Sequence, residues 1–141
     1  MPEEYYNILI KLAKKAMSKG EVPVSAIIVN NNKVIAKSSN SRQKKYDVCN
    51  HAEINVIKKA SKKNKDWRLN NCDLYVTLKP CSMCESIIKQ SRIKNVYYLL
   101  DKPTEKKEYN KTSFEKQNIS TQEKQYSRYL KAFFQKKRDK I

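Results

Sequence analysis

Segments with the apolar spacing of amphipathic helices alternate with short β-branched runs along this chain. Apolar residues recur at helical intervals from about Glu3 to Lys19, and Gly20 can close that helix because glycine tolerates the left-handed conformation. The runs 22–29 and 33–37 predict two strands of a hairpin, with three asparagines as the turn between them. The alternation indicates one α/β sandwich.

The same alternation continues through the middle of the chain. The pattern predicts a polar loop over 38–50, a helix over about 52–62, a strand over 74–77, a helix that opens just after Pro80, and a strand over 95–100. Neither an internal repeat nor a linker divides the sequence, so we expect a single domain over residues 1–141.

The C-terminal part is less regular until its last helix. Residues 102–119 are polar and lysine-rich, with one weak strand expected near 114–119. Ser120 and Glu123 have the spacing of a capping box, which predicts the start of a helix. One apolar stripe follows on that helix, made of Tyr126, Tyr129, Leu130, Phe133 and Phe134. We expect its tyrosines, and also Trp67, to lie in the core.

A single glycine, a single histidine and four cysteines among 141 residues exclude several kinds of site. One glycine cannot form the Gly-x-Gly-x-x-Gly loop of dinucleotide-binding proteins, and one histidine cannot form a multi-histidine metal site within one chain. The N-terminus has no basic segment before an apolar one, and no apolar run could span a membrane, so we expect neither a signal peptide nor a membrane helix. We therefore expect a reducing, cytoplasmic environment, in which cysteines serve as ligands or core thiols.

Lysine and arginine number 31 against 14 acidic residues, which gives a formal net charge of +17. Residues 1–100 carry 19 basic and 8 acidic side chains and residues 101–141 carry 12 and 6, so the charge is spread along the chain. Such a chain attracts polyanions, because contacts with phosphates release counterions. The lysine and asparagine bias of an AT-rich genome would give the same total. A nucleic-acid partner is therefore one of two interpretations of the charge.

Three residues have the types and spacing of a catalytic zinc site. Cys81 and Cys84 lie three positions apart at the expected start of a helix, where the helix N-terminus stabilises thiolates. His51 lies at the expected start of the preceding helix. One imidazole and two thiolates leave the fourth tetrahedral position of zinc for water, whereas structural zinc sites usually have four protein ligands.

Glu53 is a candidate general acid and base beside this site. It aligns with Val56, Ile57 and Ala60 on the inward face of its helix, where an unpaired carboxylate is costly. Since two residues along a helix rotate by about 200°, His51 and Glu53 can approach one metal only if His51 lies at the non-helical entry to the first turn. A carboxylate there could move protons to and from water that zinc has acidified.

The residue types and their spacing alone also allow other interpretations of the cysteines. A Cys-x-x-Cys pair also occurs in redox sites and as two core thiols. We expect Cys49 and Cys72 to be buried thiols, although Cys49 is close enough to His51 to act as a substitute ligand.

The sequence resembles the zinc-dependent nucleobase deaminases, and more closely the bacterial tRNA-specific adenosine deaminases. The H-x-E and P-C-x-x-C signature of that class is matched by Asn50-His51-Ala52-Glu53 and by Pro80-Cys81-Ser82-Met83-Cys84. A further similar stretch is Glu21-Val22-Pro23-Val24-Ser25-Ala26, and the resemblance runs to about Asp101 before it resumes in the last helix. It implies a three-layer α/β/α sandwich of the cytidine-deaminase type with a central mixed sheet.

The resemblance also implies a reaction and its catalytic residues. His51, Cys81 and Cys84 would bind one Zn²⁺ per subunit. Glu53 would take a proton from water and deliver it to the adenine ring and then to departing ammonia. The implied enzyme is a homodimer that converts the wobble adenosine of a tRNA anticodon loop to inosine.

Substrate contacts are implied in the same way. Asn40 would hydrogen-bond the flipped base, Val24 would line its pocket, and Asp101 would contact the target nucleotide. A basic C-terminal helix would contact RNA through Arg128, Lys131, Phe133, Lys137 and Arg138.

The sequence departs from that family near the expected site. Lys79 replaces the glutamate usual before Pro-Cys, Ser25 replaces a glycine, and the segment after Asp101 lacks the family's Lys-x-Gly. The altered segment motivates a second hypothesis, a deaminase of a free base or nucleoside such as guanine or cytosine. A third hypothesis is a non-catalytic zinc-containing RNA-binding protein, against which the inward-facing Glu53 argues.

Overall fold

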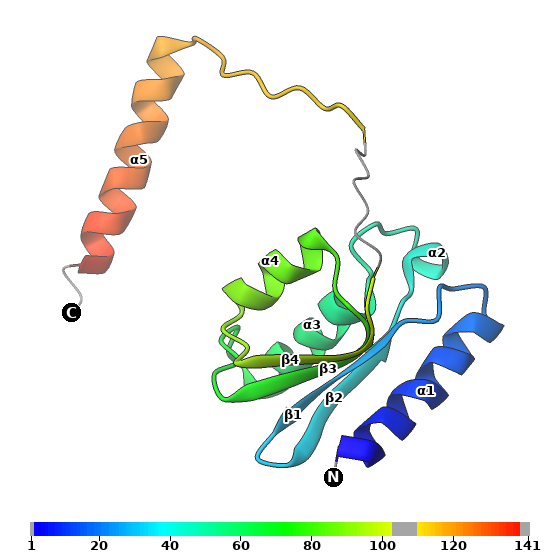
Figure 1. Cartoon of the computed structure of the whole chain (residues 1–141). Coiled ribbons are helices and arrows are strands. Elements are labelled where there is room, and N and C mark those ends of the chain that lie inside the picture. Colours follow the sequence, from blue (N-terminus) through cyan, green and yellow to red (C-terminus); the bar gives the residue numbers. More distant parts are fainter. Residues whose placement is uncertain (1, 103–109, 139–141) are drawn as a thin grey trace. The chain divides into compact units, whose positions relative to one another are not determined.

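The computed structural model describes residues 2–102 and 110–138. The chain divides into two units, Met1–Glu105 and Lys106–Ile141, and each is described by itself. The first unit contains α1 (Pro2–Ser18), β1 (Ser25–Asn30), β2 (Lys33–Ser39), α2 (Arg42–Lys45), α3 (Ala52–Asn64), β3 (Cys72–Leu78), α4 (Ser82–Gln90) and β4 (Asn95–Leu100) (Figure 1). The second unit contains α5 (Ser120–Arg138).

Four strands form a mixed sheet in the order β2-β1-β3-β4. β1 pairs antiparallel with both β2 and β3, whereas β3 and β4 pair in parallel. A parallel pair needs a crossover connection, and α4 lies within that connection. Ile28 of β1 and Leu74 of β3 are register partners at the centre of the sheet, and both are fully buried.

Helices cover both faces of this sheet, as Figure 1 shows. On one face Ile27 and Val29 of β1 pack in a cluster with Leu9 of α1. On the other face Ala26 and Ile28 belong to a larger core that includes residues of α3 and α4. Successive side chains of a strand point to opposite faces, so β1 supplies both cores. The predicted three-layer α/β/α sandwich with a mixed sheet is confirmed.

Some element boundaries differ from the sequence prediction. β1 begins later than position 22, because Pro23 has no N–H to donate to a sheet and Val22 is exposed. The loop predicted over 38–50 contains the short helix α2. The strand predicted near 114–119 is wrong, since residues 110–119 contain no strand. Their sequence is mostly polar and offers no apolar face to pair against a sheet.

Three aromatic side chains lie outside the core, so the prediction that they are core residues is wrong. Trp67 is 51% exposed, and Arg68 and Arg92 lie over its ring at 4.5 and 5.4 Å from the centroid. These cation–π contacts take the place of core packing. Tyr126 and Tyr129 are exposed as well, and no residue of α5 is buried.

Several turns of the first unit have left-handed backbone at residues other than glycine. Asn31 and Asn32, with φ of 51° and 61°, form the turn between β1 and β2. Tyr46 and Lys65 have φ of 51° and 54° at the ends of α2 and α3. Asparagine tolerates this conformation better than other residues with a Cβ, whereas tyrosine and lysine are strained in it.

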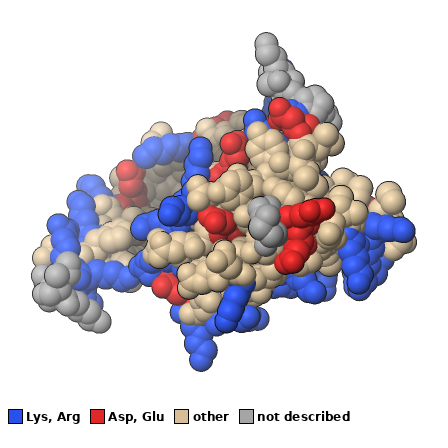
Figure 2. Space-filling model, turned by 60° about the horizontal axis from the view of Figure 1, so that its bottom comes forward, with Lys and Arg blue, Asp and Glu red and all other residues tan. Residues whose placement is uncertain are grey.

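Basic side chains are distributed over the surface. The face in Figure 2 shows Lys and Arg at many separate places, with Asp and Glu between them. This agrees with the even distribution of charge along the sequence. No helix within residues 2–102 or 110–138 is both long and apolar enough to cross a membrane.

Candidate metal centre and active site

Two helix N-termini bring the three predicted metal ligands together. His51 and Cys81 are the N-cap residues of α3 and α4 and have extended backbone, while Cys84 lies in the first turn of α4. The Nδ1 atom of His51 lies 3.7 Å from the Sγ atom of Cys81 and 3.4 Å from that of Cys84. All three donor atoms lie within 4.8 Å of one another.

The spacing of these atoms fits a zinc ion. Zinc–sulfur and zinc–nitrogen bonds of about 2.3 and 2.0–2.1 Å give a tetrahedral N···S edge of about 3.6 Å, close to both N···S distances in the structure. One imidazole and two thiols are also ligands that zinc prefers. Within residues 2–102 and 110–138, no other histidine, cysteine or carboxylate side chain joins these three as a fourth ligand. Three ligands therefore leave one coordination position for a reactant.

The protonation of the ligands depends on their surroundings. Burial lowers the pKa of His51, and the positive charges of Arg42 and Lys102 lower it further, so the imidazole stays neutral and able to bind a metal. Burial raises the pKa of the Cys84 thiol, and the nearby Glu53 carboxylate raises it further. The Cys84 thiol therefore ionises when a cation is bound beside it, as metal binding requires.

Glu53 is buried beside the ligand cluster. It lies in the first turn of α3 and is 4% exposed. Burial raises the pKa of its carboxyl, while hydrogen bonds from backbone N–H and from the Cys84 side chain oppose that rise. A raised pKa suits a group that must both accept and donate a proton near neutral pH. His51 is at the non-helical entry to α3, and its extended backbone lets both side chains approach one site despite their spacing of two residues.

A pocket with a volume of about 140 Å³ opens over these groups. Its lining residues are Val22, Val24, Asn40, Arg42, His51, Glu53, Leu78, Lys79, Cys81 and Lys102. The predicted base contacts Asn40 and Val24 are therefore beside the ligand cluster. The Oδ1 atom of Asn40 accepts a hydrogen bond of 2.8 Å from the N–H of Ala52, which fixes the side chain at the pocket wall.

The structure places Lys102, and not Asp101, in the lining of this pocket. Asp101 is exposed, and its Oδ1 atom accepts a hydrogen bond of 3.1 Å from the Lys102 N–H. Sequence reasoning missed Arg42 and Lys102 as pocket residues. The departure at Lys79, which the sequence analysis noted, was the one available signal that the pocket is rich in cations.

The two remaining cysteines differ from each other. Cys72 is buried, as predicted, and burial raises the pKa of its thiol. Cys49 is exposed, so the prediction of a buried thiol there is wrong. It follows Asp47, whose Oδ1 atom accepts a hydrogen bond from the Cys49 N–H in an exposed turn. Cys49 is not part of the ligand cluster.

The predicted RNA-contacting residues lie on α5, in the second unit. They are Arg128, Lys131, Phe133, Lys137 and Arg138, and all are exposed. The Lys137 ammonium lies 5.2 Å from the Phe133 ring centroid, and Phe133 packs edge-on against Phe134. One helix thus presents cations and aromatic rings together, the combination that single-stranded nucleic acids bind.

The sequence model of the MafB19-like deaminase family matches residues 2–138. The chain belongs to this family. Among curated relatives of this deaminase chain, the tRNA-specific adenosine deaminase of Bacillus subtilis (strain 168) is 44% identical over 96 residues, which cover 68% of this chain and 60% of that protein. The tRNA-specific adenosine deaminase of Aquifex aeolicus (strain VF5) is 43% identical over 104 residues, which cover 72% and 69%. The chain thus spans about three-fifths to two-thirds of the length of these relatives.

Solved structures resemble this deaminase chain as well. A structure from biochemical and structural studies of A-to-I editing by tRNA:A34 deaminases has a TM-score of 0.71 and 38% identity, and covers 72% of this chain and 74% of that one. Guanine deaminase from Bacillus subtilis has a TM-score of 0.78 and 24% identity, and covers 92% and 93%. At that identity the second likeness concerns the fold alone. The resemblance to tRNA-specific adenosine deaminases inferred from the sequence is confirmed.

Proposed function

We propose that this chain is a zinc-dependent deaminase that converts the wobble adenosine of a tRNA anticodon loop to inosine. The observation that carries the proposal is one pocket lined by His51, Cys81 and the buried Glu53, with the third ligand atom, the Sγ of Cys84, within 4.8 Å of the other two. Relatives named tRNA-specific adenosine deaminases support the substrate. The +17 net charge suits a polyanion, and unpaired loop bases are the part of RNA that a pocket can take up.

Different residues at the site would bind the metal, transfer protons and hold the base. His51, Cys81 and Cys84 would hold zinc, which when bound supplies a Lewis acid that lowers the pKa of water. Glu53 accepts a proton from the attacking water and delivers it to the adenine ring. The second proton of that water is then transferred to the amino group, which leaves as ammonia. Adenosine and water thus give inosine and ammonia. Asn40 and Val24 hold the base that has been flipped out of its stack.

Further parts of the proposal concern the whole protein. The family match spans both units, which supports one deaminase domain over residues 1–141. The resemblance to the bacterial enzymes supports a cytoplasmic homodimer with one Zn²⁺ per subunit, contacts from Asp101 to the target nucleotide, and RNA contacts from α5. Sedimentation equilibrium of the zinc-loaded protein tests the dimer.

One experiment tests the activity. Purified protein is assayed for zinc and then incubated with unmodified tRNA that carries a wobble adenosine, beside a Glu53→Gln control. We expect inosine from the wild type, and a rate lower by a factor of about 10²–10⁴ in the variant because a positioned acid–base group is lost. The variant should retain its zinc, since Glu53 is not in the ligand cluster.

Two outcomes would replace the proposal. Ammonia released from guanine or cytosine, with no inosine in tRNA, would show a deaminase of free bases. Zinc binding and RNA binding without turnover of any base would show a non-catalytic RNA-binding protein.

A further inference from the structure

A second hollow lies next to the candidate active site. Its volume is about 270 Å³, and it is lined by residues of α1, β2, α2 and α3. Asn40 lines both this hollow and the active-site pocket, so the two cavities meet at one side chain. Apart from Asn40, no residue that lines the second hollow has a role in the proposed reaction, so any function of this hollow must be a separate one.

Five lysines converge on this hollow, and we call it the lysine hollow. They are Lys15, Lys19, Lys37, Lys44 and Lys59. Lys15 and Lys19 lie in and directly after α1, and the other three lie in β2, α2 and α3, so the fold and not a local charge run brings them together. No ion pair within residues 2–102 and 110–138 includes any of them. The Lys59 ammonium donates a hydrogen bond of 3.1 Å to the Lys37 carbonyl, and the positive charges of all five lysines would attract an anion in the hollow.

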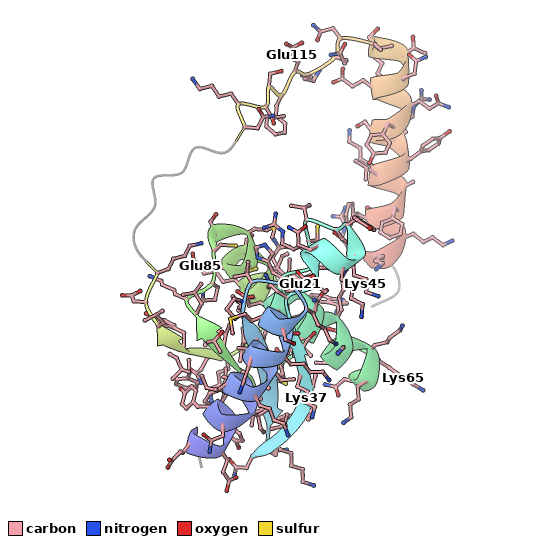
Figure 3. All side chains as sticks on the ribbon, turned by 90° about the vertical axis from the view of Figure 1, so that its right-hand side faces the viewer. Glu21, Lys37, Lys45, Lys65, Glu85 and Glu115 are labelled. Atoms are coloured by element: carbon pink, nitrogen blue, oxygen red, sulfur yellow. The ribbon has the colours of Figure 1, made fainter. Side chains whose placement is uncertain are left out.

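One acidic residue, Glu21, also lines the lysine hollow, and its carboxylate is engaged by backbone. Its Oε1 atom accepts a hydrogen bond from the Gln43 N–H at 3.1 Å, and its Oε2 atom accepts one from the Lys44 N–H at 2.8 Å. Glu21 is buried, and it fixes the α2 turn. In Figure 3 it lies next to α2 and Lys45, on the same side of the first unit as Lys37.

The α2 turn forms part of the wall of both cavities. Arg42 at its start lines the active-site pocket, and Lys44 lines the lysine hollow. A single strand of nucleic acid that leaves the pocket past Asn40 would therefore contact Arg42 on one side of the α2 turn and the lysines on the other side. Positive grooves that follow a backbone in this way are how proteins hold single-stranded nucleic acids.

We propose that the lysine hollow binds the phosphodiester backbone of the RNA strand that flanks the base in the active site. This inference rests on the proposed function, because the base in the pocket determines where the strand runs. It also separates substrate classes. A free base has no phosphate for these lysines, whereas a nucleotide within a strand has one on each side.

The test compares two triple variants of the zinc-loaded protein. The first is Lys15→Gln with Lys19→Gln and Lys59→Gln, which removes three cations from the lysine hollow. The control is Lys11→Gln with Lys14→Gln and Lys58→Gln, which removes three exposed cations of α1 and α3 that lie outside the hollow. Both variants have the same net charge, so only the position of the lost charge differs.

Binding of a fluorescent anticodon stem–loop with a wobble adenosine is measured by anisotropy over a series of salt concentrations. For the hollow variant we expect affinity at least about tenfold lower, and a plot of log affinity against log salt that is shallower by about 2, since each lost single-strand phosphate contact contributes about 0.7. The control should keep most of the wild-type affinity and slope. Equal losses in the two variants, or no loss in the hollow variant, would overturn the inference.

Turnover keeps this inference separate from the proposed function. At saturating stem–loop the hollow variant should form inosine with the wild-type kcat and a raised KM, because its lysines hold the strand and do not touch the reacting atoms. If the wild type forms no inosine, the proposed function fails, and the binding comparison still decides the role of the hollow. If the wild type forms inosine and the two variants bind alike, only the hollow inference fails.

Discussion

Asn40 connects the scaffold to the proposed chemistry at the scale of one residue. Its Oδ1 atom accepts the N–H of Ala52, the first residue of α3, and so satisfies a donor that every helix start leaves unpaired. The oxygen is committed to the helix, so the amide NH₂ is the part that can donate to a base. Structural and substrate roles therefore reside on different atoms of one side chain.

Two substitutions separate these roles. Asn40→Asp keeps an acceptor for Ala52 and loses the NH₂ donor, so we expect stability near that of the wild type and a fall in kcat/KM of about 5–150-fold, the loss from one buried hydrogen bond of about 1–3 kcal/mol. Asn40→Ala also loses the acceptor and should cost a further ~0.5–2 kcal/mol of stability. Denaturant unfolding and inosine kinetics measure the two effects. An Asn40→Asp protein that unfolds as easily as Asn40→Ala would contradict the assignment.

The two cysteines outside the ligand cluster should differ in reactivity. Burial raises the pKa of Cys72, so its thiolate forms only at a higher pH than that of an ordinary thiol, and burial also blocks access. We expect alkylation of exposed Cys49 at neutral pH, and alkylation of Cys72 only as the pH rises or the protein unfolds. Mass spectrometry of peptides after timed iodoacetamide treatment measures both rates. Equal rates at neutral pH in folded protein would contradict the burial of Cys72.

The sequence could predict the ligands and Glu53, because their short-range spacing at two helix starts carries the signal. It could not predict Arg42 and Lys102 as pocket residues. Both follow strands by a few residues, and their place depends on how the α2 turn and the end of β4 meet across the sheet. Such long-range juxtapositions leave no periodic pattern.

At the scale of elements, Ser25 joins α1 to the sheet. Its hydroxyl donates to the carbonyl of Leu9 in α1 at 2.6 Å, and its N–H donates to the Oγ1 atom of Thr77 on β3 at 3.2 Å. The residue is fully buried. This position, which differs from the glycine of the resembling family, thus adds a side-chain bond between two layers of the sandwich.

Removal of that hydroxyl should loosen α1. Ser25→Ala should lower the free energy of unfolding by about 0.5–1.5 kcal/mol, and Ser25→Gly by roughly another 0.5–1 kcal/mol because glycine loses more backbone entropy. Urea unfolding gives the energies, and hydrogen exchange should show faster exchange in α1 than in α3. Unchanged exchange in α1 would mean that apolar packing of Leu9 holds this helix alone.

Element types were predictable where apolar periodicity was strong, as in α1 and α3, or where a short apolar run stood between polar segments, as in β4. α2 was missed because its four residues are too few to show a period, and because a tertiary contact from Glu21 holds the turn. The aromatic stripe of α5 predicted burial, yet that helix buries none of its residues. Apolar residues at helical spacing indicate that a helix has an apolar face, but they do not indicate which element packs against that face.

At the scale of the whole molecule, the ligand cluster lies where two helix starts meet. His51 precedes α3 and the two cysteines begin α4, so a bound ion would cross-link two helices that also share the main apolar core. Under the proposed function, folding and metal binding are therefore linked.

Removal of the metal should lower stability. A ligand that binds only the folded state stabilises it by about 2.7 kcal/mol at 100 times its Kd, so a strong chelator should lower the Tm of zinc-loaded protein by several degrees. Added Zn²⁺ should restore it. Differential scanning fluorimetry measures the shift, and Cys81→Ser serves as a control with a much smaller response. A Tm that the chelator leaves unchanged in the wild type would argue against zinc in this cluster.

The left-handed turns have a consequence for adaptation to heat. Lys65 ends α3 with φ of 54°, in a conformation that costs a residue with a Cβ roughly 1 kcal/mol more than glycine. The chain has one glycine, Gly20, and at several other turns a residue with a Cβ adopts this left-handed conformation. Lys65 is exposed and lines neither the active-site pocket nor the lysine hollow. A Lys65→Gly substitution can therefore relieve strain and raise thermal tolerance without changing the residues that line either cavity.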